Sequence, residues 1–225
     1  MKGYFITATD TNAGKTLFAA GLLASLALQG YQTLGFKPVA SGCKKTKQGL
    51  QNADALALMQ ASSVKLDYAA VNPYAFEPAI APHIAAELAG SEINLEVIAS
   101  LIRSQQSKAD YILVEGVGGW LVPLNARQTL ADLAGLLGYK IILVVAMRLG
   151  CINHALLTAQ AIRQSGLEIA GWIANMGRQD EQMLYLQENI LTLKNSLGTP
   201  YLGFLPDLSM HSQELAMGIH LEYLL

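Results

Sequence analysis

Short, continuously apolar runs alternate along the chain with longer stretches in which apolar residues recur every three or four positions. Continuous apolar runs are typical of strands covered on both faces of a parallel sheet, and the longer spacing is typical of helices that bury one face. The expected strands cover residues 3–8, 33–37, 110–115, 140–146, 168–175 and 200–204, and the expected helices cover 15–29, 95–106 and about 153–164.

This alternation predicts an α/β fold with a mainly parallel β-sheet and helices on both faces. No repeat, low-complexity tract or linker interrupts it, so a single domain over residues 1–225 is expected. Ligands of such sheets bind beyond the carboxyl ends of the strands. The chemistry should therefore lie near residues 8–16, 37–42, 115–119, 146–153 and 175–177.

The composition of the chain argues against nucleic-acid binding, membrane association and secretion. Hydrophobic residues make up 52% of the chain, charged residues 14%, and the formal net charge is −2. A chain of this charge has no basic surface for nucleic acid or an anionic membrane. The apolar stretch 17–28 is shorter than the roughly 20 residues of a membrane span, and Asp10 and Lys15 interrupt any signal peptide. Two cysteines without a CxxC motif fit a reduced, cytoplasmic location.

The turn after the first expected strand ends in Gly14-Lys15-Thr16 and leads directly into the first expected helix. Gly14 lets the backbone pass close to a phosphate, and the amides of a helix start point toward an anion. Lys15 can reach the outer phosphates of a nucleotide, and the Thr16 hydroxyl can bind Mg²⁺. A chance Gly-Lys-Thr in a surface turn is the alternative. Thr9 stands where a standard Walker A loop has glycine, so a modified phosphate loop is expected.

Two carboxylates are candidate ligands of Mg²⁺, for which one or two suffice. Glu115 ends an apolar strand, as the acid of a Walker B strand does. Asp54 opens an apolar helical pattern, where an acid is more often a cap, and the residues alone leave both interpretations open. The glycine-rich stretch 116–119 either approaches a ligand closely or forms a simple turn.

Lys37 ends the second expected strand at the edge where ligands bind, and Pro38 restricts the backbone after it. One charge pair at about 4 Å and an effective dielectric near 20 is worth on the order of 4 kcal/mol, so a second lysine would help to join an anionic nucleophile to ATP. We expect a Lys37→Ala variant to lose turnover and to keep its fold. Ser41 is a candidate hydrogen-bond donor, although a serine in a turn is the common case.

A second anion site is expected where strand 140–146 meets the following helix. Gly150 permits an unusual backbone angle, and exposed amides there can bind a carboxylate. The alternative is a plain turn in which Asn153 caps the helix. The four histidines lack the spacing of metal ligands, and we assign them no chemistry.

Taken together, these segments resemble the dethiobiotin synthetase family of P-loop NTPases over most of the chain. The order and spacing of the matching stretches make the resemblance specific. They are TDT (9–11), GKT (14–16), GFKPVASG (35–42), NADALAL (52–58), VNPY (71–74), PH (82–83), VEGVGGW (114–120), LGCINH (149–154) and AGWIAN (170–175). Ala8 and Asn12 depart from the glycine and glutamate that are common in the family.

The resemblance implies a role for particular residues. Lys37 and Lys15 would be catalytic, and Thr16, Asp54 and Glu115 would bind Mg²⁺. Thr11 and Ser41 would contact the substrate, as would Gly150, Cys151, Ile152 and Asn153 of the other subunit in a homodimer. The implied ATP-binding residues are Asn12, Ala13, Gly14, Lys15, Thr16, Leu17, Asp54, Glu115, Gly116, Val117, Gly118, Asn175, Met176, Pro206, Asp207, Leu208 and Gln213, with Asn175 at the adenine.

The resemblance also implies a cyclo-ligase reaction of biotin synthesis. Diaminopelargonic acid would take up CO₂ as a carbamate, ATP would convert the carbamate to a carbamic–phosphoric anhydride, and the neighbouring amine would close the ring and expel phosphate. Such a reaction asks the protein mainly for positioning and charge stabilisation.

Three other functions stay open on the residues. A partitioning-type P-loop switch shares the fold but carries a signature lysine at the position of Asp10. A cobyrinate-type amide ligase would carry a glutaminase domain beyond Leu225. A nucleotide-binding module without turnover is the third. Phosphate release that requires both bicarbonate and the diamine would separate the synthetase from all three.

Overall fold

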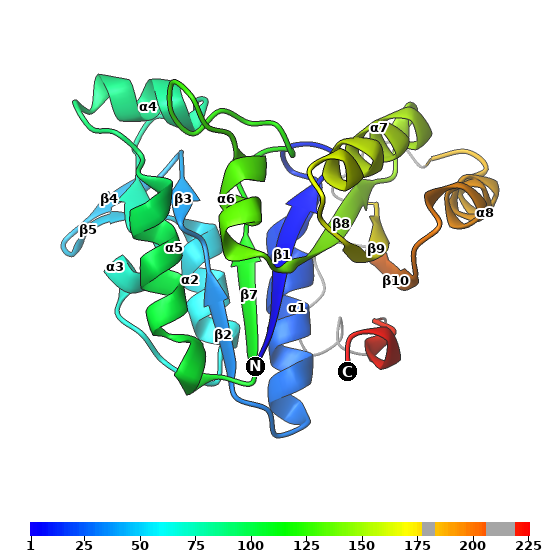
Figure 1. The fold of residues 1–225 in the computed structure, drawn as a ribbon, viewed down its shortest axis with the longest axis horizontal. Coiled ribbons are helices and arrows are strands. Elements are labelled where there is room, and N and C mark those ends of the chain that lie inside the picture. The colour runs from blue at the N-terminus through cyan, green and yellow to red at the C-terminus, as the bar shows by residue number, and fades with distance from the viewer. Residues whose placement is uncertain (177–182, 206–218) are drawn as a thin grey trace.

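Six parallel strands form the central sheet of the computed structural model, which describes residues 1–176, 183–205 and 219–225 (Figure 1). Their order across the sheet is β10-β9-β8-β1-β7-β2, so β7 lies between two strands that precede it in the chain. The strands are β1 (Lys2–Ala8), β2 (Thr33–Phe36), β7 (Tyr111–Glu115), β8 (Lys140–Ala146), β9 (Ile169–Asn175) and β10 (Tyr201–Leu205). The prediction of a mainly parallel α/β sheet is confirmed.

The register of the sheet brings several strand ends to one edge. Glu115 at the end of β7 is opposite Ile6 of β1, and Ala8 of β1 is opposite Val144 of β8. Asn175 at the end of β9 is opposite Ala146 at the end of β8. The loops that follow these strands therefore leave the sheet side by side.

Each strand contributes alternate residues to two separate cores, because successive side chains of a strand point to opposite faces. On one face, Ile6 and Val144 pack in a core with Phe18 and Leu22 of helix α1 (Lys15–Leu28). Helix α2 (Ala53–Ala61) lies beside α1 and adds Leu58 to the same core.

On the other face, Phe5, Val114 and Leu143 pack against three helices, which Figure 1 shows in front of the sheet. These are α5 (Leu95–Ser104), α6 (Leu130–Leu137) and α7 (Cys151–Gln164). Helix α8 (Leu186–Leu197) joins this core beside α7. Both faces of the sheet are covered, which accounts for its continuously apolar strands.

Several short elements were not expected from the sequence. They are the strand pair β3 (Val39–Ala40) with β6 (Tyr74–Ala75), the hairpin β4 (Lys44–Thr46) with β5 (Gly49–Gln51), the helices α3 (Tyr68–Val71) and α4 (Pro82–Leu88), and the 3-10 turns η1 (Gln106–Lys108) and η3 (Leu221–Tyr223). Most of them lie between β2 and α5, the stretch for which the sequence pattern predicted little. None of the helices in the described ranges combines the length and the hydropathy that a membrane span requires.

Two expected boundaries were wrong in an informative way. Helix α7 begins at Cys151 rather than near residue 153, and Gly150 precedes it with a left-handed backbone (φ 93°). Asn153 therefore lies inside the helix and is not its cap. The expected helix 95–106 ends at Ser104 and continues as the separate 3-10 turn η1.

Candidate functional site

The phosphate loop, residues 9–14, connects β1 to α1 at the carboxyl edge of the sheet. Thr9 ties its start to β8: the Thr9 N–H donates to the carbonyl of Val144 (3.0 Å), and the Ala146 N–H donates to Thr9 Oγ1 (3.2 Å). The loop passes through the left-handed region at Asn12 (φ 58°) and at Gly14 (φ 94°). Asparagine tolerates this backbone better than most residues, which gives a physical reason for Asn12.

Lys15 folds back across the phosphate loop. Its ammonium donates to the carbonyl of Gly118 (2.7 Å) and to the carbonyl of Asp10 (3.2 Å), and the residue is buried. Burial and, to a smaller extent, the nearby charge of Lys37 lower the pKa of Lys15 to about 8, against the opposing effect of three carboxylates. The loop, the lysine and the glycine-rich stretch after β7 thus form one structure.

This pKa predicts how anion binding depends on pH. A bound polyphosphate favours the charged form of Lys15, so above pH 8 binding must be accompanied by proton uptake. The affinity for metal-free tripolyphosphate should fall as the pH rises from 8 to 10, with a slope that approaches tenfold per pH unit. Titration calorimetry at several pH values measures the slope, and a Lys15→Met variant should lose it. An equal slope in that variant would assign the proton to another group.

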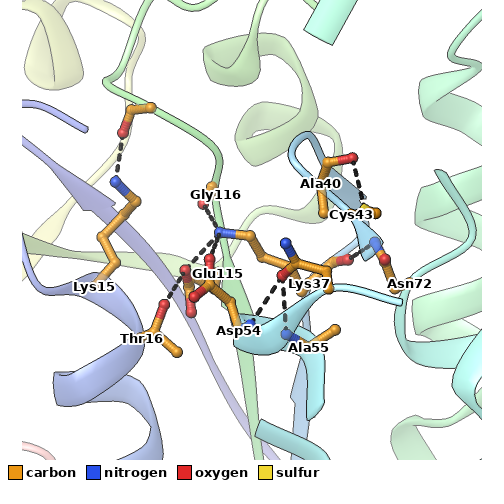
Figure 2. A network of polar contacts seen from close by, with 12 residues as sticks. Lys15, Thr16, Lys37, Ala40, Cys43, Asp54, Ala55, Asn72, Glu115 and Gly116 are labelled. Carbon is orange, nitrogen blue, oxygen red and sulfur yellow. Dashed lines mark hydrogen bonds and ion pairs between the residues drawn. The ribbon is translucent and has the colours of Figure 1, made fainter. Parts of the chain in front are cut away.

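A second cluster lies beside the loop and joins Lys37, Glu115, Thr16 and Asp54 (Figure 2). The Lys37 ammonium donates to Glu115 Oε1 (2.5 Å) and to the Gly116 carbonyl (2.9 Å), and lies 3.5 Å from Asp54 Oδ2. The hydroxyl of Thr16 donates to the same Glu115 oxygen (2.8 Å). Lys37 and Glu115 are almost fully buried, whereas the Asp54 side chain is 44% exposed. Residues from α1, β7, α2 and the end of β2 therefore converge on one point, as the sequence predicted.

Charge compensation keeps Lys37 cationic. Burial alone would lower the pKa of Lys37, but the carboxylates of Glu115 and Asp54 outweigh burial and raise this pKa above its ordinary value. Lys37 therefore carries its positive charge throughout the physiological pH range.

The carboxylate of Asp54 does not cap α2, because the nearby Asn52 does so. The side chain of Asn52 caps α2 by accepting from the N–H groups of Asp54 (3.0 Å) and Ala55 (3.2 Å). Because Asn52 fills the capping role, the carboxylate of Asp54 is left to face Lys37. The interpretation of Asp54 as a helix cap, left open by the sequence, was wrong.

A hydrogen-bonded chain that the sequence did not predict holds the two sides of the cluster together. The Asn52 N–H donates to the hydroxyl of Tyr68 (2.7 Å), which donates to Asn72 Oδ1 (2.7 Å). The Asn72 amide donates in turn to the carbonyl of Lys37 (2.6 Å). Asn72 belongs to the matching stretch VNPY, which was the available signal for this positioning role.

The donors of this cluster fit Mg²⁺. The hydroxyl of Thr16 and the carboxylates of Glu115 and Asp54 are hard oxygen ligands. The second oxygen of Glu115, Oε2, is buried and has no hydrogen-bond partner within the described ranges, which suits an incoming cation. In the part of the chain that the structure describes, no three His, Cys, Asp or Glu side chains group as a metal site. Two carboxylates and one hydroxyl would leave positions in an octahedral Mg²⁺ shell for waters and phosphate oxygens.

The residues expected to contact the substrate lie around the same edge. The hydroxyl of Ser41 is buried without a partner, and Thr11 is exposed next to Gly118. The turn before α7 is linked to the loop by an ion pair between Arg148 and Asp10. In the described ranges, no hydrogen bond or ion pair connects residues 150–153 to the Lys37 cluster.

The remaining predicted ATP-binding residues fall into two groups. Asn175 is fully buried at the end of β9, with its amide donating to the carbonyl of Ala13 (2.7 Å), and the Met176 N–H donates to the carbonyl of Leu205 (3.1 Å). The stretch 116–118 lies against the phosphate loop, and Leu17 continues from it into α1. Pro206, Asp207, Leu208 and Gln213 lie outside the described residues.

A cavity of about 580 Å³ lies at the opposite end of the sheet, at the amino ends of β1 and β8. Its polar groups are engaged with one another: Lys140 pairs with Glu168 at 2.8 Å, and the Tyr4 hydroxyl donates to the carbonyl of Leu224 (2.8 Å). Burial, with Tyr111 and Glu168 nearby, raises the pKa of Tyr4 to about 12, so its hydroxyl stays protonated. The chemistry of the chain is therefore concentrated at the carboxyl edge.

Known proteins resemble this chain over nearly its whole length. A family described as an AAA domain matches residues 2–214. The protein named ATP-dependent dethiobiotin synthetase BioD in Cellvibrio japonicus (strain Ueda107) is 54% identical over 96% of this chain and 93% of its own length. Its namesake in Pseudomonas paraeruginosa (strain DSM 24068 / PA7) is 50% identical over 99% and 96%. BioD 1 of Escherichia coli O157:H7 is 45% identical over 96% of each chain.

Solved structures share the fold at low identity. The septum site-determining protein MinD from Pyrococcus horikoshii OT3, solved with Mg-ADP, has a TM-score of 0.56 and 18% identity, and covers 99% of this chain and 88% of its own. A ParA family ATPase from Chlorobium tepidum TLS has a TM-score of 0.57 and 14% identity, with 96% and 89% covered. These structures confirm the P-loop NTPase-like fold.

Proposed function

The chain belongs to the family of ATP-dependent dethiobiotin synthetases, and we propose that it closes the ring of dethiobiotin on diaminopelargonic acid, using CO₂, Mg²⁺ and ATP. Family membership makes it an ATP-dependent ligase. The observation that carries the more detailed proposal is the buried Lys37, held between Glu115 and Asp54 beside the phosphate loop. This arrangement places a permanent positive charge where a nucleotide and an anionic nucleophile would meet.

The proposed reaction balances without a nucleophilic side chain. One amine of the substrate takes up CO₂ and loses a proton, which leaves a carbamate. A carbamate oxygen attacks the γ-phosphorus of ATP, ADP leaves, and a carbamic–phosphoric anhydride forms. The second amine attacks the carbonyl carbon and loses a proton, a C–N bond forms, the C–O bond to phosphate breaks, and the cyclic urea and inorganic phosphate are released.

The side chains of the site supply charge and position for these steps. Lys15, which crosses the loop, would contact the outer phosphates of ATP with its ammonium group. Lys37 is placed to reduce the repulsion between carbamate and phosphate. When bound, Mg²⁺ would be held by Thr16, Asp54 and Glu115 and would neutralise charge on the phosphates.

The substrate contacts of the proposal extend to a second subunit. Thr11 and Ser41 would face the substrate from one chain, and Gly150, Cys151, Ile152 and Asn153 of the other would bind its carboxylate. Leu149, directly before this turn, is 98% exposed, and Leu157 of α7 is also exposed. Apolar side chains on the surface beside the turn favour burial by a second copy. A single domain over residues 1–225 and a cytoplasmic location complete the proposal.

The partner-regulated switch is the alternative that the shared fold suggests, since MinD and ParA proteins have this architecture. The structure supplies an argument against it at position 10. Asp10 is ion-paired with Arg148, and its carbonyl accepts from Lys15, so this position provides an acid and an acceptor where a switch of that class has a lysine.

One experiment tests the proposed reaction directly. The protein is incubated with ATP, Mg²⁺, diaminopelargonate and labelled bicarbonate, and the products are identified by mass spectrometry. The expected result is one label per cyclic urea and one phosphate per product, with no phosphate when either the diamine or bicarbonate is omitted. Phosphate release that does not depend on the diamine would contradict the proposal.

A further inference from the structure

The buried amide of Asn175 lies directly against the phosphate loop. Its Nδ2 donates to the carbonyl oxygen of Ala13 (2.7 Å), and a methyl group added at Gly14 would lie 2.0 Å from the same nitrogen. The side chain is fully buried and joins positions 162 residues apart in the chain. We propose that Asn175 is a positioning residue that holds the Ala13–Gly14 peptide in the orientation needed to bind phosphates. This inference rests on the proposed nucleotide site and adds to it a residue that acts through the loop backbone.

The geometry of one peptide unit explains how the residue would act. The carbonyl of Ala13 and the N–H of Gly14 belong to the same trans peptide, and in a trans peptide these two groups point in opposite directions. A carbonyl held against Asn175 therefore turns the N–H of Gly14 away from the protein interior. Amides turned outward at a helix start are the groups that bind phosphate.

The strands on both sides of Asn175 hold its backbone in place. Its backbone is paired with Ala146 of β8 on one side and with Leu205 of β10 on the other, and its carbonyl accepts from the Met147 N–H (2.8 Å). The loop residue that it holds has no such support from the sheet. Gly14 has a left-handed backbone (φ 94°), a conformation that needs an external constraint to be the one selected.

The orientation of the amide follows from its partner. A carbonyl oxygen can only accept, so Nδ2 must face Ala13, and Oδ1 remains as an acceptor that has no hydrogen-bond partner among the described residues. A nucleotide base placed here would therefore meet an acceptor. Asn175 would then have two separable roles, one toward the loop through Nδ2 and one toward the base through Oδ1.

Inorganic tripolyphosphate separates these roles, because it has phosphates and no base. Binding of tripolyphosphate and of ATP is measured by calorimetry for the wild-type protein and for the variants Asn175→Ala and Asn175→Leu. The leucine keeps the approximate shape of the side chain, removes the donor and adds no charge that would itself repel phosphate. We expect both variants to bind tripolyphosphate at least tenfold more weakly than the wild-type protein.

An Asn94→Ala variant is the matched control. It removes an asparagine that caps α5 by accepting from the Val97 N–H (3.1 Å), outside the site. Its melting temperature should fall, yet its affinity for tripolyphosphate should stay within twofold of the wild-type value. Loss of stability alone therefore cannot produce the result expected for Asn175, and the leucine variant is decisive if the alanine variant does not fold.

Each other outcome has one meaning. Variants that lose ATP affinity but keep tripolyphosphate affinity would limit Asn175 to a contact with the base and overturn the inference. A wild-type protein that binds ATP but not tripolyphosphate would also overturn it, because a loop held in place by Asn175 binds phosphates without the base. A wild-type protein that binds neither ligand would instead contradict the proposed function.

Discussion

Replacing Lys37 with alanine is expected to lower the rate of ATP-dependent ring closure by on the order of 10²–10³-fold or more, the range found when one preorganised donor to a transition state is removed. The structure supplies the reason. The side chain of Lys37 is almost fully buried and stays charged between Glu115 and Asp54, so no water molecule or flexible surface cation can replace it readily. The rate is measured as dethiobiotin formed per enzyme per unit time, at saturating ATP and diamine.

The same substitution should also lower stability, although the variant is still expected to fold. Removing one partner of a buried ion pair leaves the other charge uncompensated and costs about 3–5 kcal/mol. A Lys37→Met/Glu115→Gln double variant, which removes both charges, should recover most of the free energy of unfolding and none of the turnover. The control is Lys140→Ala, because Lys140 forms an exposed pair with Glu168 at 2.8 Å. Near-normal turnover in Lys37→Ala would remove Lys37 from the reaction.

The second large effect is expected for Glu115→Gln. This carboxylate accepts from Thr16 and Lys37 through one oxygen, and its other oxygen is buried and unpaired. The amide keeps the shape and one acceptor but loses the charge that a divalent cation needs. The Mg²⁺ concentration for half-maximal activity should rise on the order of 10–100-fold, which is the effect of disturbing even the outer partners of a metal site.

Direct metal binding distinguishes this role from a general loss of activity. Mn²⁺ affinity in the presence of ATP, followed by electron paramagnetic resonance, should fall in Glu115→Gln and stay unchanged in Glu168→Gln, the exposed acid at the opposite end of the sheet. An unchanged Mn²⁺ affinity in Glu115→Gln would show that this carboxylate serves only as the counter-ion of Lys37.

The sequence predicted the sheet well because its strands are short, mainly apolar runs. Residues 140–146, for example, match β8 at both ends. It also predicted the convergence of Lys37, Asp54 and Glu115, since parallel strands deliver their carboxyl ends to one edge. These predictions combined the local pattern of apolar residues with the rule that parallel strands end at one edge of the sheet.

The unpredicted parts depend on contacts between distant residues. The hairpin strands β4 and β5 have three residues each and no apolar alternation, so nothing in their sequence distinguishes them from a loop. The choice of Asn52 over Asp54 as the cap of α2 is made by hydrogen bonds and not by residue type, because either side chain can cap a helix. The local sequence pattern therefore predicts neither the hairpin nor the residue that caps the helix.

The order of the strands has a consequence for how the enzyme is made. β7, which carries Glu115, lies between β1 and β2, although both of those strands precede it in the chain. A growing chain on the ribosome that has not yet reached residue 111 holds both lysines but lacks Glu115, which pairs with Lys37, and Gly118, whose carbonyl accepts from Lys15. The contacts that hold the two lysines in place are therefore completed only when β7 is inserted between the two earlier strands.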